Sequence, residues 1–479
     1  MKKRSSIKIN YLYNLVYTLL NTALPLLTAP YLARVVGAEG VGTYAYYHAY
    51  AHFFYIVAKL GLNNYGTRKI SKCRTEDELS ETFSSIYYQQ LITSTIANIT
   101  YWLFCTTIMK KNSIHAYIMS IIVLASFFDI DWLFSGLEQF KTISKKNIFV
   151  KTLSVILIFL LVKKKEDLWK YSLLMSLSMF FGYSSMWLSL KRIVKFRKIE
   201  LSSILSHIKP NLKLVIPVFS ISIYRQLDKI MLGSMSNLLE TGYYENAEKV
   251  IYALCGFITA FGTIMMPRIS NMISRGKERE SSKYMVYSMQ FMMSLMFAMS
   301  AGIMAVSNNL SVVLFGPEFF ASGKLMAFLS ITLPLIGWSN IIRSQYVIPK
   351  GEDNIYISTV VIGAIIDICV NLVFIPKYAA FGAVLGTIFA EGSIPITQWL
   401  LLRKRINYLN IFKKTIFAPI IGLFIYVSAS LIGKSAVNFT KILFFQIIVG
   451  IMVYIFSTVM YFVFFEKEVI IKLKSRKSE

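Results

Sequence analysis

The sequence predicts an all-α polytopic membrane protein with about 14 transmembrane helices. Of its 479 residues, 55% are hydrophobic and only 16% are charged, whereas soluble domains average about 45–50% apolar and 25% charged residues. The mean hydropathy is +0.55, and the apolar residues are spread along the whole chain. Their runs are continuous and long enough for helices, which argues against a closed barrel of alternating strands. This composition excludes a soluble enzyme and a single-span receptor.

Each predicted span is an apolar run that approaches the roughly 20 residues needed to cross a bilayer core. In chain order the runs cover residues 10–33, 42–62, 82–108, 114–135, 147–162, 168–190, 212–235, 248–272, 284–307, 325–346, 355–375, 381–402, 416–433 and 441–465.

The charge pattern predicts that both termini face the cytoplasm. The chain carries 51 Lys and Arg against 25 Asp and Glu, a net charge of +26. No nucleic-acid-binding motif accompanies this charge, so we expect no nucleic-acid partner. With a cytoplasmic N-terminus, the inside segments hold about three times as many basic residues as the outside segments, as the positive-inside rule expects. Loop 163–167 is the exception, because it would place three lysines outside.

Two short matches at an offset of 200, the second with a one-residue gap, suggest an internal duplication. Gly42-Thr43-Tyr44 corresponds to Gly242-Tyr243-Tyr244, and Arg68-Lys69-Ile70-Ser71 corresponds to Arg268-Ile269-Ser270. Six spans per repeat predict parallel repeats related by an axis along the membrane normal. The sequence therefore predicts a six-helix lobe over residues 1–205, a second over 206–410, and two further helices with a cytoplasmic tail over 411–479.

The densest group of charges within a span is Arg225, Asp228 and Lys229. Their spacing places them on one helical face, and ionisable groups inside a bilayer are costly unless they pair or line a wet cavity. One interpretation is a cationic lining for an anionic substrate; the other is a structural ion pair with a neighbouring helix. Arg34 and Lys59 either add to that lining or extend toward the membrane interface.

Two carboxylates, Asp367 and Glu391, lie near the middle of their spans. With Asp228 they could couple transport to H⁺ or Na⁺, or they could pair with the basic residues. His48 and His52 have a spacing that can hold a metal. No acidic or cysteine partner accompanies them, so a polar cavity wall is the preferred interpretation. The four cysteines show no metal-site or disulfide spacing. We predict no metal, no cofactor and no catalytic residue.

A series of motifs gives the chain a family resemblance. It resembles the polysaccharide transporters of the multidrug/oligosaccharidyl-lipid/polysaccharide superfamily, specifically the Wzx-type flippases. The motifs are Pro30-Tyr31-Leu32-Ala33-Arg34-Val35-Val36-Gly37, Glu39-Gly40-Val41-Gly42-Thr43-Tyr44, Tyr65-Gly66-Thr67-Arg68, Asp131-Trp132-Leu133-Phe134-Ser135-Gly136, Asp228-Lys229-Ile230-Met231-Leu232-Gly233, and Gly382-Ala383 with Gly386-Thr387 and Glu391.

The resemblance implies a transporter, not an enzyme. It implies export of an undecaprenyl-diphosphate-linked oligosaccharide across the bacterial cytoplasmic membrane by alternating access, for capsule, O-antigen or exopolysaccharide synthesis. A polysaccharide polymerase, glycosyltransferases and membrane lipid are the implied partners. Two alternatives remain open. A cation-coupled multidrug antiporter of the same superfamily would need an anionic cavity, and a membrane glycan polymerase or ligase would need a large outer loop.

Overall fold

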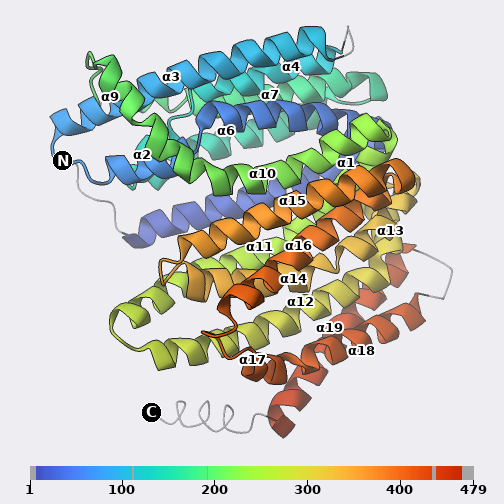
Figure 1. Cartoon of the computed structure of the whole chain (residues 1–479). Helices are drawn as coiled ribbons and strands as arrows, with labels where there is room; N and C mark the ends of the chain where they lie inside the picture. The colour runs from blue at the N-terminus through green and yellow to red at the C-terminus, as the bar shows by residue number, and fades with distance from the viewer. Residues whose placement is uncertain (1–6, 110–112, 191–192, 434–438, 466–479) are drawn as a thin grey trace. The chain divides into compact units, whose positions relative to one another are not determined.

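The computed structural model describes residues 7–109, 113–190, 193–433 and 439–465. Within these ranges every regular element is a helix and no strand occurs (Figure 1). The all-α prediction is therefore confirmed. The chain divides into two compact units, Met1–Gly242 and Tyr243–Glu479. The lobe boundaries predicted from the sequence stay a prediction, and each unit is considered separately.

The helices of unit 1 pack around a core of aromatic and aliphatic side chains. The bulky Trp132 is 1% exposed at its centre. Gly66 leaves room for this ring, because a Cβ at Gly66 would lie 2.7 Å from it. The helices are α1 (Ile7–Lys59), α2 (Leu62–Ile70), α3 (Glu76–Thr107), α4 (Ile114–Leu124), η1 (Ala125–Phe127), α5 (Asp131–Gly136), α6 (Phe140–Leu161), η2 (Lys165–Asp167), α7 (Leu168–Ser184), α8 (Trp187–Leu190), α9 (Leu201–Ser206) and α10 (Ile208–Met235).

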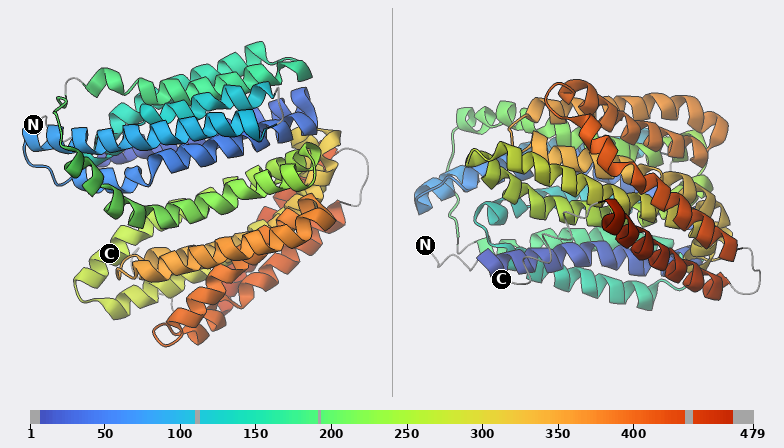
Figure 2. Two further views of the ribbon diagram at one scale, coloured as in Figure 1. Left: turned by 45° about the horizontal axis from the view of Figure 1, so that its top comes forward. Right: turned by 90° about the horizontal axis from the view of Figure 1, so that it is seen from below.

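Unit 2 contains the helix hairpin α15–α16, whose two helices are drawn in orange and run alongside each other in Figure 2. Its elements are α11 (Leu238–Ser274), whose residues up to Gly242 belong to unit 1, α12 (Glu278–Phe315), η3 (Pro317–Phe319), α13 (Phe320–Leu329), α14 (Thr332–Ile342), the π-helix η4 (Arg343–Val347), α15 (Asp353–Tyr378), α16 (Ala380–Leu402), α17 (Tyr408–Thr415), α18 (Phe417–Ile432) and α19 (Phe439–Phe465). Helices α18 and α19 pack against each other and against α12.

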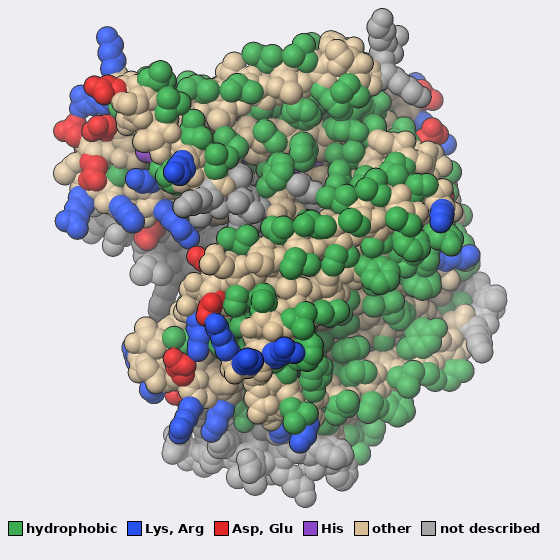
Figure 3. Space-filling view, viewed as in Figure 1, with side chains coloured by type: hydrophobic (Ala, Val, Ile, Leu, Met, Phe, Trp, Pro, Cys, Tyr) green, Lys and Arg blue, Asp and Glu red, His purple; other side chains and the backbone are tan. Residues whose placement is uncertain are grey.

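All fourteen predicted spans coincide with a helix or with short helices in series. By length and composition alone, eight helices of the described chain could cross a membrane, or nine if the bent pair Pro317–Leu329 and Thr332–Val347 is one span. On the face shown in Figure 3, hydrophobic side chains form a broad band and charged side chains gather at its margins. The chain is a multi-pass membrane protein.

Helix α1 contains the first two predicted spans and the outer loop expected between them. Its backbone departs from helical geometry at Gly37, where φ is 73° and ψ is 178°. A positive φ is strained for residues with a Cβ but readily adopted by glycine. One glycine therefore replaces the predicted loop of eight residues.

Candidate functional site

The charged group predicted on the seventh span lies on α10, which packs against α1 within unit 1. Asp228 is only 1% exposed, Lys229 is partly buried, and Arg225 is exposed. The structure thus places an exposed guanidinium one helical turn from a buried carboxylate, as their spacing predicts. Arg34 is exposed on α1, before the break at Gly37.

Near its C-terminal end, α10 makes a close, polar contact with the second half of α1. The hydroxyls of Tyr46 and Tyr50 lie 3.1 and 3.4 Å from Ser234 Oγ. A Cβ at Gly233 would lie 2.2 Å from the ring of Tyr46. Because the glycine admits the tyrosine ring, α10 and α1 approach closely at this level.

A ladder of rings runs along α1 from Tyr44 to Tyr55. The rings of Tyr44 and His48 are 5.3 Å apart, those of His48 and His52 are 5.7 Å apart, and those of His52 and Tyr55 are 5.8 Å apart. The two histidines therefore belong to a stacked wall, and no cluster of three or more His, Cys, Asp or Glu in the described ranges could hold a metal.

The ladder ends at a buried ion pair. The Tyr55 hydroxyl donates to Asp129 Oδ2 over 2.5 Å, and Lys59 Nζ lies 2.9 Å from the same oxygen. Lys59 also donates to the backbone carbonyl of Asp129 at 2.7 Å. Gln90 donates to that carbonyl and accepts from the indole N–H of Trp132, both at 2.9 Å. In this structure the charge of Lys59 is balanced internally, so contact with a substrate would require this pair to open.

In unit 2 the two predicted carboxylates lie on the α15–α16 hairpin. Asp367 on α15 is 0% exposed and Glu391 on α16 is 5% exposed. Asn371, one turn after Asp367, fills the space beside Gly386, where a Cβ would lie 2.1 Å from its Oδ1. Thr387 Oγ1 lies 2.8 Å from the hydroxyl of Tyr244 on α11. The Tyr244–Thr387 contact therefore joins α11 to α16, which packs along α15.

The beginning of α11 adds further buried polar groups to unit 2. Glu245 forms an ion pair with Lys249 at 2.9 Å, and Glu248 is 5% exposed. Asn246 is fully buried, and its amide atoms have no hydrogen-bond partner in the described part of the chain. Buried polar groups are costly unless a partner satisfies them. This segment is therefore a second candidate for an ion or polar ligand.

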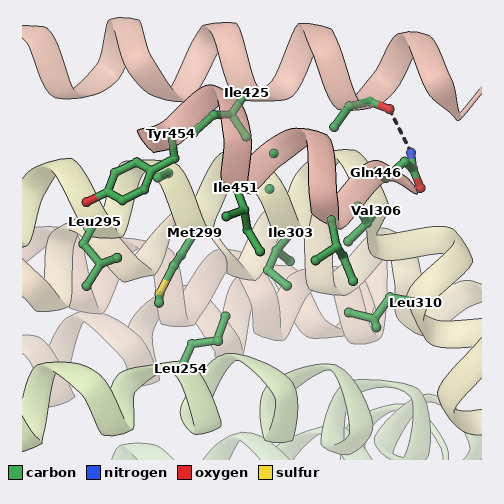
Figure 4. A pocket seen from close by; sticks show the side chains of 15 residues that line it. Leu254, Leu295, Met299, Ile303, Val306, Leu310, Ile425, Gln446, Ile451 and Tyr454 are labelled. Atoms are coloured by element: carbon green, nitrogen blue, oxygen red, sulfur yellow. Dashed lines mark hydrogen bonds between the residues drawn. The ribbon is translucent and has the colours of Figure 1, made fainter. Parts of the chain in front are cut away.

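Unit 2 also contains an apolar cavity of about 290 Å³ between α11, α12, α18 and α19. Figure 4 shows Met299 and Ile303 from α12 and Ile451 from α19 lining it. Gln446 is its main polar neighbour, and its amide donates to the Ala429 carbonyl at 3.0 Å. The cavity is thus suited to hydrocarbon.

Sequence reasoning missed Tyr55, Gln90 and Asp129 as parts of the site. A useful signal was present, because Asp129 lies two residues before Asp131-Trp132 of the family-like motif. Its pairing with Lys59 joins residues 70 positions apart, which helical spacing cannot reveal. The four cysteines are all free thiols.

Comparison with known proteins identifies the family. The model of the polysaccharide biosynthesis protein family matches residues 7–273. A putative O-antigen transporter of Shigella dysenteriae is 25% identical over 377 residues, covering 78% of this chain and 93% of its own length. A putative O-antigen transporter of Escherichia coli K12 is 25% identical over 275 residues, covering 56% and 65%.

Solved structures share the fold. The inward closed conformation of the lipid II flippase MurJ aligns with a TM-score of 0.74 at 15% identity, covering 94% of this chain and 99% of the other. An inward-facing multidrug resistance MATE transporter aligns with a TM-score of 0.62 at 14% identity, covering 83% and 98%. The resemblance stated from the motifs is confirmed. The family match covers more than half of the sequence, and the chain belongs to the polysaccharide biosynthesis protein family.

Proposed function

We propose that this protein is a flippase that moves a polyprenyl-diphosphate-linked oligosaccharide across the cytoplasmic membrane by alternating access. The observation that carries the proposal is the cation-bearing face of α10, where exposed Arg225 and partly buried Lys229 flank buried Asp228. The O-antigen transporter relatives and the fold shared with a lipid II flippase support a lipid-linked saccharide as the cargo. The sugar sequence is left open.

Arg225 is the proposed contact for the diphosphate. It lies about two-thirds of the way along α10, a position inside a predicted span where a guanidinium is costly to hold. A diphosphate offers paired oxygens that match the planar fork of arginine, whereas lysine acts as a point charge. Lys229 would add a second positive charge, with Asp228 holding the group in place.

The lipid part of the cargo requires an apolar environment. The cavity between α12 and α19 (Figure 4) is lined almost entirely by hydrocarbon, and burial of a CH₂ group stabilises by about 0.8 kcal/mol. We propose that it receives part of the polyprenyl chain while the glycan passes through a polar route. Substitution of Ile451 by Gln should then weaken transport of long-chain carriers more than of short-chain analogues.

We propose that ion binding at Asp367 and Glu391 drives the cycle, with Asp228 as a further candidate. Carboxylate, amide and hydroxyl oxygens from Asp367, Asn371 and Thr387 are the ligand types that hard cations prefer. Transport by vesicles under a Na⁺ gradient and under a pH gradient distinguishes the two ions. Asp367→Asn should abolish the response to the effective gradient.

The test of the main proposal is export in a strain that lacks the chromosomal gene. Arg225→Ala should abolish surface polysaccharide, and Arg225→Lys should retain part of it because the charge survives without the fork. Arg279→Ala, an exposed arginine at the start of α12, is the matched control and should export normally. Membrane levels of each variant are compared by blot. Full export by Arg225→Ala at normal expression would overturn the proposed contact.

A multidrug antiporter shares the fold but is less compatible with the charges. An organic cation would need a net negative site, whereas the α10 face carries two positive groups and one negative group. Drug sensitivity of the deletion strain, measured beside its surface polysaccharide, separates the two functions.

A further inference from the structure

We propose that a pocket at one end of unit 2 binds the headgroup of phosphatidylglycerol, an anionic membrane lipid. The pocket has a volume of about 110 Å³ and lies where three connections meet. Glu278 and Ser281 come from the start of α12, Lys350 follows η4, and Arg405 precedes α17. The positive-inside pattern predicts all three connections on the cytoplasmic side. The pocket shares no residue with the α10 face.

Gln345 provides the first argument for a ligand. It lines the pocket and is 1% exposed, yet neither atom of its amide has a hydrogen-bond partner among the described residues. An unsatisfied buried polar group costs about 1–3 kcal/mol. A phosphate oxygen can accept from Nε2, and a glycerol hydroxyl can donate to Oε1. One phosphatidylglycerol headgroup supplies both groups.

The backbone at Gln345 is also unusual. Residues Arg343–Val347 form a π-helix, and the Ile348 N–H donates to the Arg343 carbonyl at 2.9 Å. Single π-helical turns insert an extra residue and occur frequently at functional sites. Here the turn directly precedes Lys350, so an amide and an ammonium group reach the same pocket.

The cations of the pocket pair with carboxylates that solvent can reach: the side chain of Glu278 is 63% exposed and that of Glu352 is 33% exposed. Lys350 lies 3.0 Å from Glu278 and 4.8 Å from the ring centre of Tyr346. Arg405 pairs with Glu352, and the Arg405 side chain is 52% exposed. Exposed ion pairs contribute only about 0–1 kcal/mol. Both cations can therefore exchange a carboxylate for a phosphate, which accepts several charge-assisted hydrogen bonds.

Helix α17 indicates that the pocket lies at headgroup depth. Leu409, Phe412 and Ile416 are 67%, 51% and 68% exposed, and their spacing places them on one face of the helix segment. Tyr408 and Ile411 are buried on another face. An exposed apolar stripe on such a helix is typical of the membrane interface.

Charged side chains gather beside this helix. Figure 3 shows Lys and Arg with neighbouring acidic side chains near the start of α17. Basic pockets on the cytoplasmic side of helix bundles bind anionic headgroups. The combination of interfacial depth with a small cationic pocket favours a lipid phosphate over a soluble one.

The test uses the full-length protein purified in detergent, with retained lipid measured by native mass spectrometry. Offered equal amounts of phosphatidylglycerol and phosphatidylcholine, the wild type should retain phosphatidylglycerol. The double variant Lys350→Gln/Arg405→Gln should weaken this binding at least about tenfold, because two charge-assisted contacts are lost. Gln345→Glu should weaken it similarly, because its carboxylate repels phosphate. Lys404→Gln, an exposed neighbour of Arg405, is the matched control.

A replacement variant and a competition experiment complete the test. If the double variant elutes as an aggregate in size-exclusion chromatography, Gln345→Leu, which keeps both cations, replaces it and should also reduce retention. Glycerol 1-phosphate tests a soluble ligand and should not displace the lipid. Unchanged retention in Gln345→Glu would leave only ordered water for the pocket, and equal losses in Lys404→Gln would indicate a diffuse basic surface. Displacement by glycerol phosphate would indicate a free-anion site. Each of these three results overturns the proposal.

Discussion

Gly42 and Gly242 lie against each other with reciprocal partners. A Cβ at Gly42 would lie 1.7 Å from the Leu238 carbonyl oxygen, and a Cβ at Gly242 would lie 1.9 Å from the Ala38 carbonyl oxygen. The two glycines are 200 residues apart, and so are Ala38 and Leu238. A contact in which each side presents the equivalent residues is the pattern of a two-fold pair. The two positions related by the sequence offset are thus in contact inside unit 1, and the internal duplication stays a prediction.

Substituting either glycine should destabilise the protein to a similar extent. Gly42→Ala and Gly242→Ala would each drive a methyl group into a backbone carbonyl, and overpacking of this kind costs about 1–3 kcal/mol or more. Thermal unfolding of the purified protein measures the loss. Gly302→Ala is the control, because a Cβ there meets nothing within 4 Å. A strong effect at only one of the two glycines would contradict the reciprocal contact.

The Lys59–Asp129 pair should show strong coupling. Asp129→Asn or Lys59→Met alone leaves a buried charge without its partner, which costs about 3–5 kcal/mol. The double variant should recover part of this loss, since both charges are gone. Unfolding free energies of the wild type, both single variants and the double variant give the coupling. Additive losses would mean that the pair contributes little to stability.

His207 should make stability fall in mild acid. Its Nδ1 lies 2.6 Å from the Tyr65 hydroxyl and its Nε2 lies 2.6 Å from Ser85 Oγ. Burial, and then the positive charge of Lys69, lowers the pKa of His207 below its ordinary value of 6.5. The folded state therefore favours the neutral ring. Its contribution to stability is complete above pH 6.5 and is lost as the pH falls from there through the lowered pKa.

The measurement for His207 is the Tm of the detergent-solubilised protein between pH 8 and pH 5. Wild-type Tm should fall below about pH 6.5, and His207→Gln should reduce the slope because glutamine keeps hydrogen bonding without titrating. An unchanged slope in His207→Gln would assign the pH dependence to other groups.

The predicted orientation can be checked by labelling single cysteines in a variant whose four natural cysteines are replaced. Glu166→Cys lies in the loop predicted outside, and Glu76→Cys lies at the start of α3, predicted inside; both positions are exposed. An impermeant thiol reagent should label position 166 in intact cells and position 76 only after permeabilisation. The reverse pattern would invert the topology.

Hydropathy predicted the helices well, because each span is a local property of about 20 residues. The charged group on α10 was also visible in the sequence, since Arg225 and Asp228 are one turn apart. The role of Lys59 was not visible, because its partner Asp129 is contributed by a distant segment. The outer loop expected over residues 34–41 was also wrong, because its conformation cannot be judged from hydropathy. Only the backbone shows that Gly37 alone joins the two halves of α1.

That single-residue joint has a mechanical consequence. A flexible loop would let the first two spans slide past each other, whereas one glycine allows a change of angle and almost no relative displacement. The second half of α1 carries the ring ladder and Lys59, which is tied to Asp129. If the first span shifts along the membrane normal, we expect the rings from Tyr44 to Tyr55 to shift with it. We therefore expect Gly37 to be the point at which the angle between the first two spans changes.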